Sequence, residues 1–191
     1  MNLANKITLM RVILVPVFII LIMASQIPGL AGLVADGTIS QNVLNWCALA
    51  VFIIASMTDF LDGYIARKYN MISNFGKFMD PLADKLLVCS ALICLLALGR
   101  INVFLVLIII ARDFIISGFR LVASDKGVVI AANMWGKVKT TMQMVMIGFM
   151  IPNLPLFHWI CVILSWVVLF LTVYSLMDYL IRNRGVLKDE K

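Results

Sequence analysis

The sequence predicts an all-α integral membrane protein. Three observations support this: an excess of apolar residues, six apolar stretches of membrane-spanning length, and basic residues gathered on one side of these stretches. The 191 residues are 63% hydrophobic and 14% charged, with a mean hydropathy of +1.04. Soluble domains are about half apolar and about a quarter charged, so this chain has more apolar side chains than a soluble core needs. The length favours a single domain over residues 1–191.

The apolar stretches set the expected spans. A membrane-spanning helix needs about 20 largely apolar residues, and six stretches reach this length, some of them only with polar ends. The runs are continuously apolar, which favours helices. We expect the spans near residues 8–25, 43–67, 80–98, 102–122, 134–151 and 156–181.

The basic residues set the expected orientation. Of the 16 Lys and Arg residues, all except Arg100 fall on the same side of the predicted spans. Because cytoplasmic loops collect basic residues, we expect both termini and the loops after the second and fourth spans in the cytoplasm. The basic residues form no separate stripe with interleaved aromatic residues, so the net charge of +6 does not indicate nucleic-acid binding.

Four acidic residues lie at the cytoplasmic ends of the second and third predicted spans: Asp59, Asp62, Asp80 and Asp84. A carboxylate inside a span costs about 2.5–3.5 kcal/mol at a helix centre, and four close together also repel one another. The spacing within each pair, three or four residues, places both members on one helix face. Carboxylate oxygens suit Mg²⁺, Mn²⁺ or Ca²⁺ rather than zinc. The pattern therefore predicts a site for divalent cations at the cytoplasmic side.

The residues after Asp59 strengthen this interpretation. Gly63 and Arg67 follow it by four and eight residues, along nearly the same stripe. Gly63 places bare backbone beside the acids, so a ligand can approach closely. Pro81 should either start or kink the third span. Ion pairing of the acids with neighbouring basic residues inside the membrane, or an ion-transport path, are the alternative explanations.

The segment from Asp59 to Asp84 reads Asp-x-x-Asp-Gly-x-x-Ala-Arg, eight residues, then Gly-x-x-x-Asp-x-x-x-Asp. This pattern resembles the signature of the CDP-alcohol phosphatidyltransferases without a departure, and the six-span layout is similar over nearly the whole chain. The resemblance implies an enzyme that joins an alcohol to a CDP-linked lipid.

The resemblance also implies roles for individual residues. It implies two divalent cations, Mg²⁺ or Mn²⁺, bound by the four aspartates, with Asp84 also acting as the general base. The implied contacts with the CDP-lipid are made by Asn5, Thr8, Gly63, Arg67, Ser73 and Gly76. Family members are usually homodimers. The compact length is similar to that of bacterial members, which implies a multi-pass protein of the bacterial cytoplasmic membrane.

A second group of charges bears on the acceptor alcohol. It lies near the cytoplasmic ends of the fourth and fifth predicted spans and consists of Arg112, Arg120, Lys137 and Lys139. Up to four positive charges suit an acceptor that carries its own phosphate, whereas a neutral acceptor does not need them. The alternative is ordinary cytoplasmic-side charge, together with an ion pair of Asp113 with Arg112 or Arg120.

These segments and the start of the chain, with Asn5, Thr8, Arg11 and Pro16, resemble one group within the family. Members of this group transfer a phosphatidyl group from CDP-diacylglycerol to sn-glycerol 3-phosphate and release CMP. Inositol phosphate or phosphatidylglycerol as the acceptor is an alternative within the family. An ion-coupled transporter and a structural membrane protein with paired acids are alternatives of other classes.

Overall fold

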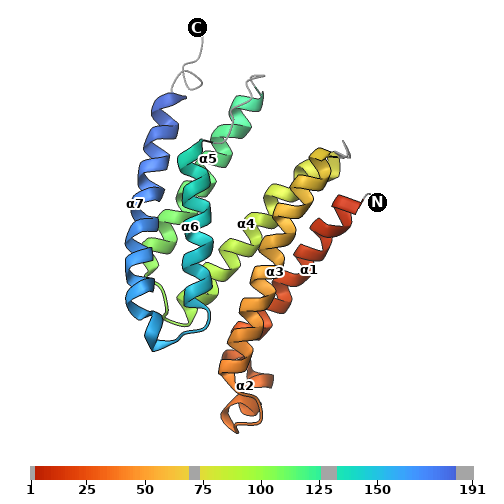
Figure 1. The fold of residues 1–191 in the computed structure, drawn as a ribbon, viewed down its shortest axis with the longest axis vertical. Coiled ribbons are helices and arrows are strands. Elements are labelled where there is room, and N and C mark those ends of the chain that lie inside the picture. Colours follow the sequence, from red (N-terminus) through yellow and green to blue (C-terminus); the bar gives the residue numbers. More distant parts are fainter. Residues whose placement is uncertain (1–2, 69–73, 126–132, 184–191) are drawn as a thin grey trace. The chain divides into compact units, whose positions relative to one another are not determined.

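The computed structural model describes residues 3–68, 74–125 and 133–183, and within them the side chains of residues 9–58, 85–124 and 133–183. All regular structure in these residues is helical (Figure 1). The chain forms two compact units. The N-terminal unit is Met1–Arg100 with Met150–Leu154, and the C-terminal unit is Ile101–Phe149 with Pro155–Lys191.

The helices coincide with the apolar stretches. They are α1 Leu3–Ile22, α2 Pro28–Ala35, α3 Gln41–Lys68, α4 Asn74–Ala97, α5 Val103–Asp125, α6 Met134–Met150 and α7 His158–Arg182, with 3-10 turns at Ala24–Gln26 and Pro155–Phe157. Each of the six expected ranges overlaps one long helix. Helix α2 lies in a segment expected to be a loop, and it starts with Pro28 at its first position, where a missing backbone N–H costs nothing.

The largest boundary error is at the start of the third expected span, and α1 also begins before its expected range. Helix α4 begins at Asn74, not near residue 80, and it continues through Pro81. The expected start followed hydropathy, which falls in the preceding polar residues. Helical hydrogen bonding does not require apolar side chains, so the helix extends beyond the apolar stretch.

In the N-terminal unit, α1 packs against α3 and α4, and Figure 1 shows α1 running alongside α3. The buried residues recur at steps of three and four: Val15, Phe18 and Ile22 on α1, and Ala48, Phe52 and Ala55 on α3. This spacing is that of one helix face. The rings of Phe18 and Phe52 meet between the helices, with centroids 5.9 Å apart.

The end of α4 is fixed by a glycine. Gly99 has a φ of 67°, a left-handed conformation that glycine adopts without steric cost. The N–H of Arg100 bonds to the Leu95 carbonyl and that of Gly99 to the Leu96 carbonyl, both at 2.9 Å, which is a Schellman motif. Arg100 Nη1 then donates to the Ile151 carbonyl at 2.6 Å. Burial lowers the pKa of Arg100 from its ordinary value.

In the C-terminal unit, α5 packs against α7. Ile116, Phe119 and Tyr179 form a buried apolar cluster, and the rings of Phe119 and Tyr179 meet edge to face at 5.6 Å. Side-chain caps start both α5 and α6. Asn102 Oδ1 accepts the Phe104 N–H at 2.8 Å, and Asn133 Oδ1 accepts the Trp135 N–H at 2.6 Å, as expected of N-cap residues.

The surface carries many apolar side chains. Among the described residues, two segments are long and apolar enough to cross a membrane, Gln41–Thr58 and Pro155–Arg182, and shorter apolar stretches lie at Leu9–Ile22 and Lys85–Ala97. Large hydrophobic residues are exposed on these helices, among them Ile53, Trp166 and Phe170. Apolar surface on this scale indicates contact with lipid or another apolar partner.

Candidate functional site

The four predicted metal-binding aspartates lie on two helices of the N-terminal unit. Asp59 and Asp62 lie near the C-terminal end of α3, and Asp80 and Asp84 lie in the N-terminal half of α4. The side chains of all four lie outside the described residues. Where side chains are described, no group of three or more His, Cys, Asp or Glu residues that could hold a metal occurs.

The positions on α3 follow from helical spacing. Among the residues of α3 whose side chains are described, Asn45, Ala48, Phe52 and Ala55 are buried. Continuing this line from Ala55 by four and then three residues leads to Asp59 and Asp62. Both positions therefore continue the buried stripe of α3 towards its C-terminal end.

The same relation holds on α4. Leu87 and Ala91 are buried, and steps of three and then four residues back from Leu87 lead to Asp84 and Asp80. Each aspartate pair thus lies on the line of buried positions of its own helix. That their carboxylates share one face and hold metal ions stays a prediction.

The predicted CDP-lipid contacts are distributed over three helices. Gly63 and Arg67 lie on α3, Gly76 on α4, and Asn5 and Thr8 on α1. Ser73 lies outside the described residues, as do the side chains of Asn5, Thr8 and Arg67. Three residues after Thr8, Arg11 is fully buried on the same line of α1 as Val15 and Phe18. A fully buried guanidinium was not expected from its place near the cytoplasmic end.

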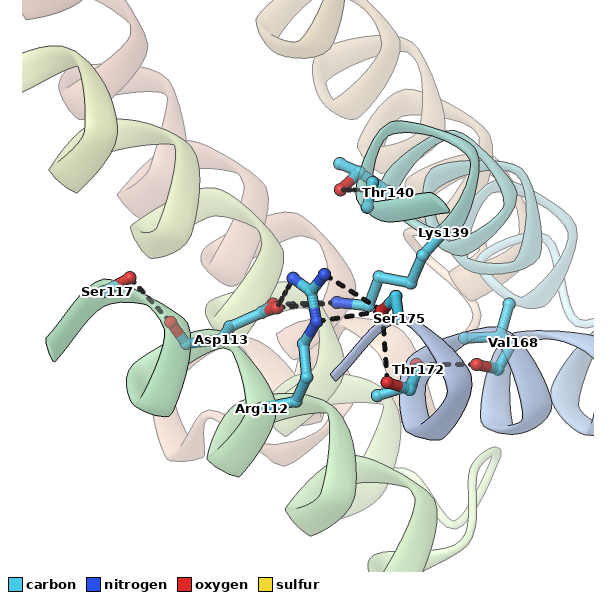
Figure 2. Close-up of polar contacts among 9 residues, drawn as sticks. Arg112, Asp113, Ser117, Lys139, Thr140, Val168, Thr172 and Ser175 are labelled. Atoms are coloured by element: carbon cyan, nitrogen blue, oxygen red, sulfur yellow. Dashed lines mark hydrogen bonds and ion pairs between the residues drawn. The ribbon is translucent and has the colours of Figure 1, made fainter. Parts of the chain in front are cut away.

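In the C-terminal unit, Asp113 on α5 joins two of the predicted acceptor-binding cations (Figure 2). Lys139 Nζ, on α6, contacts Asp113 Oδ1 at 2.8 Å and Oδ2 at 3.0 Å. Arg112 Nη1 contacts the same Oδ1 at 3.0 Å. Of the two ion pairs that the sequence left open for Asp113, the structure contains the one with Arg112. Two cations and one carboxylate leave this group with one net positive charge.

A third helix holds Arg112. Ser175 Oγ, on α7, accepts from Arg112 Nε at 3.2 Å and from Nη2 at 3.0 Å. The same hydroxyl donates to the Thr172 carbonyl at 3.2 Å, so its proton is used within the helix and its lone pairs face the guanidinium. Figure 2 shows this chain of contacts from α5 to α7.

The first turn of α6 lies against the same guanidinium. A Cβ added at Gly136 would come within 3.1 Å of Arg112 Nη2, which is closer than a carbon normally approaches. Glycine at this position therefore allows the α6 backbone to approach Arg112. Asn133 also links α6 to α7, because its amide donates to Asp178 Oδ2.

The other two predicted acceptor-binding cations are exposed. The Arg120 guanidinium lies 5.8 Å from the centre of the Tyr179 ring, within cation–π range, and Lys137 is exposed on the first turn of α6. The structure therefore brings Arg112 and Lys139 together in one partly buried network and leaves Arg120 and Lys137 at the surface.

Ser175 and Gly136 were missed as parts of this site. The sequence carries one signal for Ser175: Thr172, Ser175 and Tyr179 recur at steps of three and four in an apolar helix, and all three are buried. Such a line indicates a polar contact at a helix face. It does not say which residue is contacted.

Comparison with known proteins agrees with the signature between Asp59 and Asp84. A family model described as CDP-alcohol phosphatidyltransferase matches residues 1–174. The chain belongs to this family. The matched segment, residues 1–174, includes parts of both the N-terminal and the C-terminal unit.

The chain is similar over most of its length to several bacterial members of the family. A CDP-diacylglycerol–glycerol-3-phosphate 3-phosphatidyltransferase of Bacillus subtilis is 44% identical, over 98% of this chain and 97% of the relative. One of Mycoplasma pneumoniae is 35% identical, over 100% of this chain and 89% of the relative. A probable phosphatidylglycerophosphate synthase of Mycobacterium tuberculosis is 38% identical, over 95% and 81%.

Proposed function

We propose that the protein transfers a phosphatidyl group from CDP-diacylglycerol to sn-glycerol 3-phosphate, giving phosphatidylglycerol phosphate and CMP. The observation that carries this proposal is full-length similarity, up to 44% identity, to relatives named for this reaction. The unbroken family signature from Asp59 to Asp84 supports the donor half of the reaction. The cationic residues of the C-terminal unit support the acceptor half.

The donor half is assigned to the N-terminal unit. Asp59, Asp62, Asp80 and Asp84 would hold two divalent cations, Mg²⁺ or Mn²⁺. Their all-oxygen donor set fits such ions, and their positions continue the buried stripes of α3 and α4. The ions, when bound, supply the positive charge that draws an anionic diphosphate towards four carboxylates.

The residues around the aspartates would bind the nucleotide lipid. Arg67 would form charge-assisted hydrogen bonds with phosphate, and Gly63 would allow close approach of the ligand to the backbone. The full set assigned to the CDP-lipid is Asn5, Thr8, Gly63, Arg67, Ser73 and Gly76.

Asp84 would act as the general base. It accepts the proton of the attacking acceptor hydroxyl, if the two lie within hydrogen-bond reach. The hydroxyl oxygen forms a bond to the phosphorus that carries the diacylglycerol, and the bond from this phosphorus to the CMP oxygen breaks. CMP leaves with the electron pair of that bond.

The acceptor half is assigned to the C-terminal unit. Glycerol 3-phosphate carries a phosphate, which the charge of Arg112, Arg120, Lys137 and Lys139 would attract. The network of Arg112, Asp113 and Lys139 keeps one net positive charge, and the exposed Arg120 and Lys137 add two more. A neutral acceptor such as inositol would not need this excess of positive charge.

The proposed architecture is one family domain with six membrane spans, built on α1 and on α3 to α7. The agreement of these helices with the six apolar stretches supports it. The one-sided basic residues support cytoplasmic termini and a cytoplasmic active site. We also propose that the protein is a homodimer of the bacterial cytoplasmic membrane, as family members usually are.

The test is CMP release by the purified protein with CDP-diacylglycerol and Mg²⁺ or Mn²⁺. Glycerol 3-phosphate is compared with inositol phosphate, inositol, serine and phosphatidylglycerol as acceptor. We expect release that depends on both the metal and glycerol 3-phosphate. Release with another acceptor would contradict the acceptor assignment, and release that persists in a chelator would contradict the metal assignment.

A further inference from the structure

The predicted acceptor-binding cations Arg112 and Lys139, which both contact Asp113 in the C-terminal unit, differ in how exposed they are. The Lys139 side chain is 1% exposed and its ammonium contacts both oxygens of Asp113. The Arg112 side chain is 11% exposed. Lys139 therefore neutralises a carboxylate, whereas Arg112 is the more accessible of the two cations in the network.

The hydrogen bonds of Arg112 leave part of its guanidinium available. A guanidinium has one N–H on Nε and two on each Nη. Ser175 accepts from Nε and Nη2, and Asp113 accepts from Nη1. One N–H on each Nη has no partner among the described residues. The two remaining N–H groups can donate to the oxygens of a phosphate.

The two partners also fix where these donors point. Asp113 holds Nη1 from α5, and Ser175 holds Nε and Nη2 from α7, so the planar group is bonded at three of its atoms. Ser175 is fully buried and its own proton is donated to the Thr172 carbonyl. The hydroxyl is thereby kept as an acceptor for Arg112.

We propose that Ser175 and Asp113 are positioning residues that orient Arg112 for the acceptor phosphate, and that Lys139 acts on the acceptor through Asp113. This inference rests on the proposed function, because it assumes that Arg112 contacts glycerol 3-phosphate. It reassigns Lys139 from a direct ligand to the residue that neutralises Asp113. Without Lys139, the carboxylate of Asp113 would cancel the charge of Arg112.

The first experiment removes the Ser175 hydroxyl. Ser175→Ala is expected to raise the KM for glycerol 3-phosphate about tenfold, the typical effect of losing hydrogen bonds to a charged group. The KM for CDP-diacylglycerol should stay unchanged. If the alanine variant does not fold, Ser175→Cys keeps a similar volume with a weak acceptor, and the same direction is expected.

Thr172→Val is the matched control. Thr172 is also fully buried on α7, one turn earlier, and its hydroxyl donates to the Val168 carbonyl. Removing this hydroxyl leaves Arg112 its partners, so the KM for glycerol 3-phosphate should not change. Equal effects of the Ser175 and Thr172 variants, or an equal rise in both substrate KM values, would overturn the positioning role.

The second experiment tests the indirect role of Lys139. Lys139→Met removes the ion pair of Lys139 with Asp113 and keeps that of Arg112, and it should raise the KM for glycerol 3-phosphate about tenfold. Adding Asp113→Asn removes the excess negative charge but keeps an Oδ1 that accepts from Arg112 Nη1, so it should restore the KM to within about threefold of the wild-type value. If Lys139 bound the acceptor directly, the double variant would be at least as impaired as Lys139→Met.

Arg112→Ala distinguishes failure of the inference from failure of the proposed function. If this variant leaves the KM for glycerol 3-phosphate unchanged, the acceptor assignment itself is wrong. If it raises that KM while Ser175→Ala and Lys139→Met do not, the acceptor assignment stands and the positioning roles are wrong.

Discussion

The two units differ in how their buried charge is balanced. In the C-terminal unit, two cations and one carboxylate meet within hydrogen-bonding distance, and a serine hydroxyl completes the network. In the N-terminal unit, the described interior is mostly apolar, and the lines of buried residues on α3 and α4 continue to four acidic positions. In the C-terminal unit, the Asp113 carboxylate is thus paired with the protein's own cations. In the N-terminal unit, we propose that metal ions supplied from outside neutralise the four aspartates.

The difference agrees with the two halves of the proposed reaction. A nucleotide diphosphate is attracted to carboxylates only when bound cations reverse the local field. A small phosphorylated alcohol can be bound by the protein's own guanidinium and ammonium groups. Variants in the N-terminal unit should therefore lower turnover, and variants in the C-terminal unit should weaken acceptor binding.

The largest expected effect is in the N-terminal unit. Asp84→Asn should lower kcat by at least about a hundredfold, because it removes both the proposed base and a metal ligand. Turnover is measured as CMP release at saturating substrates, and binding of CDP-diacylglycerol should persist. The control is Asp36→Asn, since Asp36 is an exposed acid after α2 in the same unit. Near-normal turnover of Asp84→Asn would contradict the assignment of turnover to the N-terminal unit.

A smaller effect is expected at Arg112. Arg112→Ala should raise the KM for glycerol 3-phosphate about tenfold to a hundredfold, with little change in the KM for CDP-diacylglycerol. Arg112→Lys should be nearly as impaired, because an ammonium cannot reproduce the planar contacts with Ser175 and Asp113. Arg182→Ala is the control: this side chain is 69% exposed and forms an ion pair with Asp178 on its own helix. A selective loss of donor binding in the Arg112 variants would mean that the acceptor is bound elsewhere.

The smallest expected effect is at Gly136. Gly136→Ala places a carbon 3.1 Å from Arg112 Nη2, so the guanidinium must move by a few tenths of an ångström. We expect a rise of about threefold in the KM for glycerol 3-phosphate, since small displacements of an oriented group weaken binding. Gly118→Ala on α5 meets nothing within 4 Å, and it should raise helix stability without affecting this KM. Identical kinetics of the two variants would show that the position of Arg112 is not limiting.

Much of the helical framework could be predicted from the sequence. Apolar runs of membrane length located α1 and α3 to α7, because apolar side chains are the main determinant of where such helices lie. The start of α4 was predicted six residues too late, since helical hydrogen bonds continue where hydropathy falls. Helix α2 is only eight residues long and was not predicted.

The candidate sites were predictable to different degrees. The acidic pairs are local, so their spacing of three and four residues was enough to place each pair on one helix face. The cationic residues were predicted as one cluster. The structure instead pairs Arg112 and Lys139 with Asp113 and leaves Arg120 and Lys137 exposed.

The sequence by itself determined the family, the helices and the identity of the acidic and basic residues, because these depend on composition and short-range spacing. The tertiary structure decided which cation is buried and which is presented. Ser175 lies 63 residues from Arg112, and Lys139 lies 26 residues from Asp113. No helical period relates positions so far apart. Their contacts exist because α5 packs against α7 and side chains of α6 and its N-cap residue reach both helices, and burial then makes each charge require a partner.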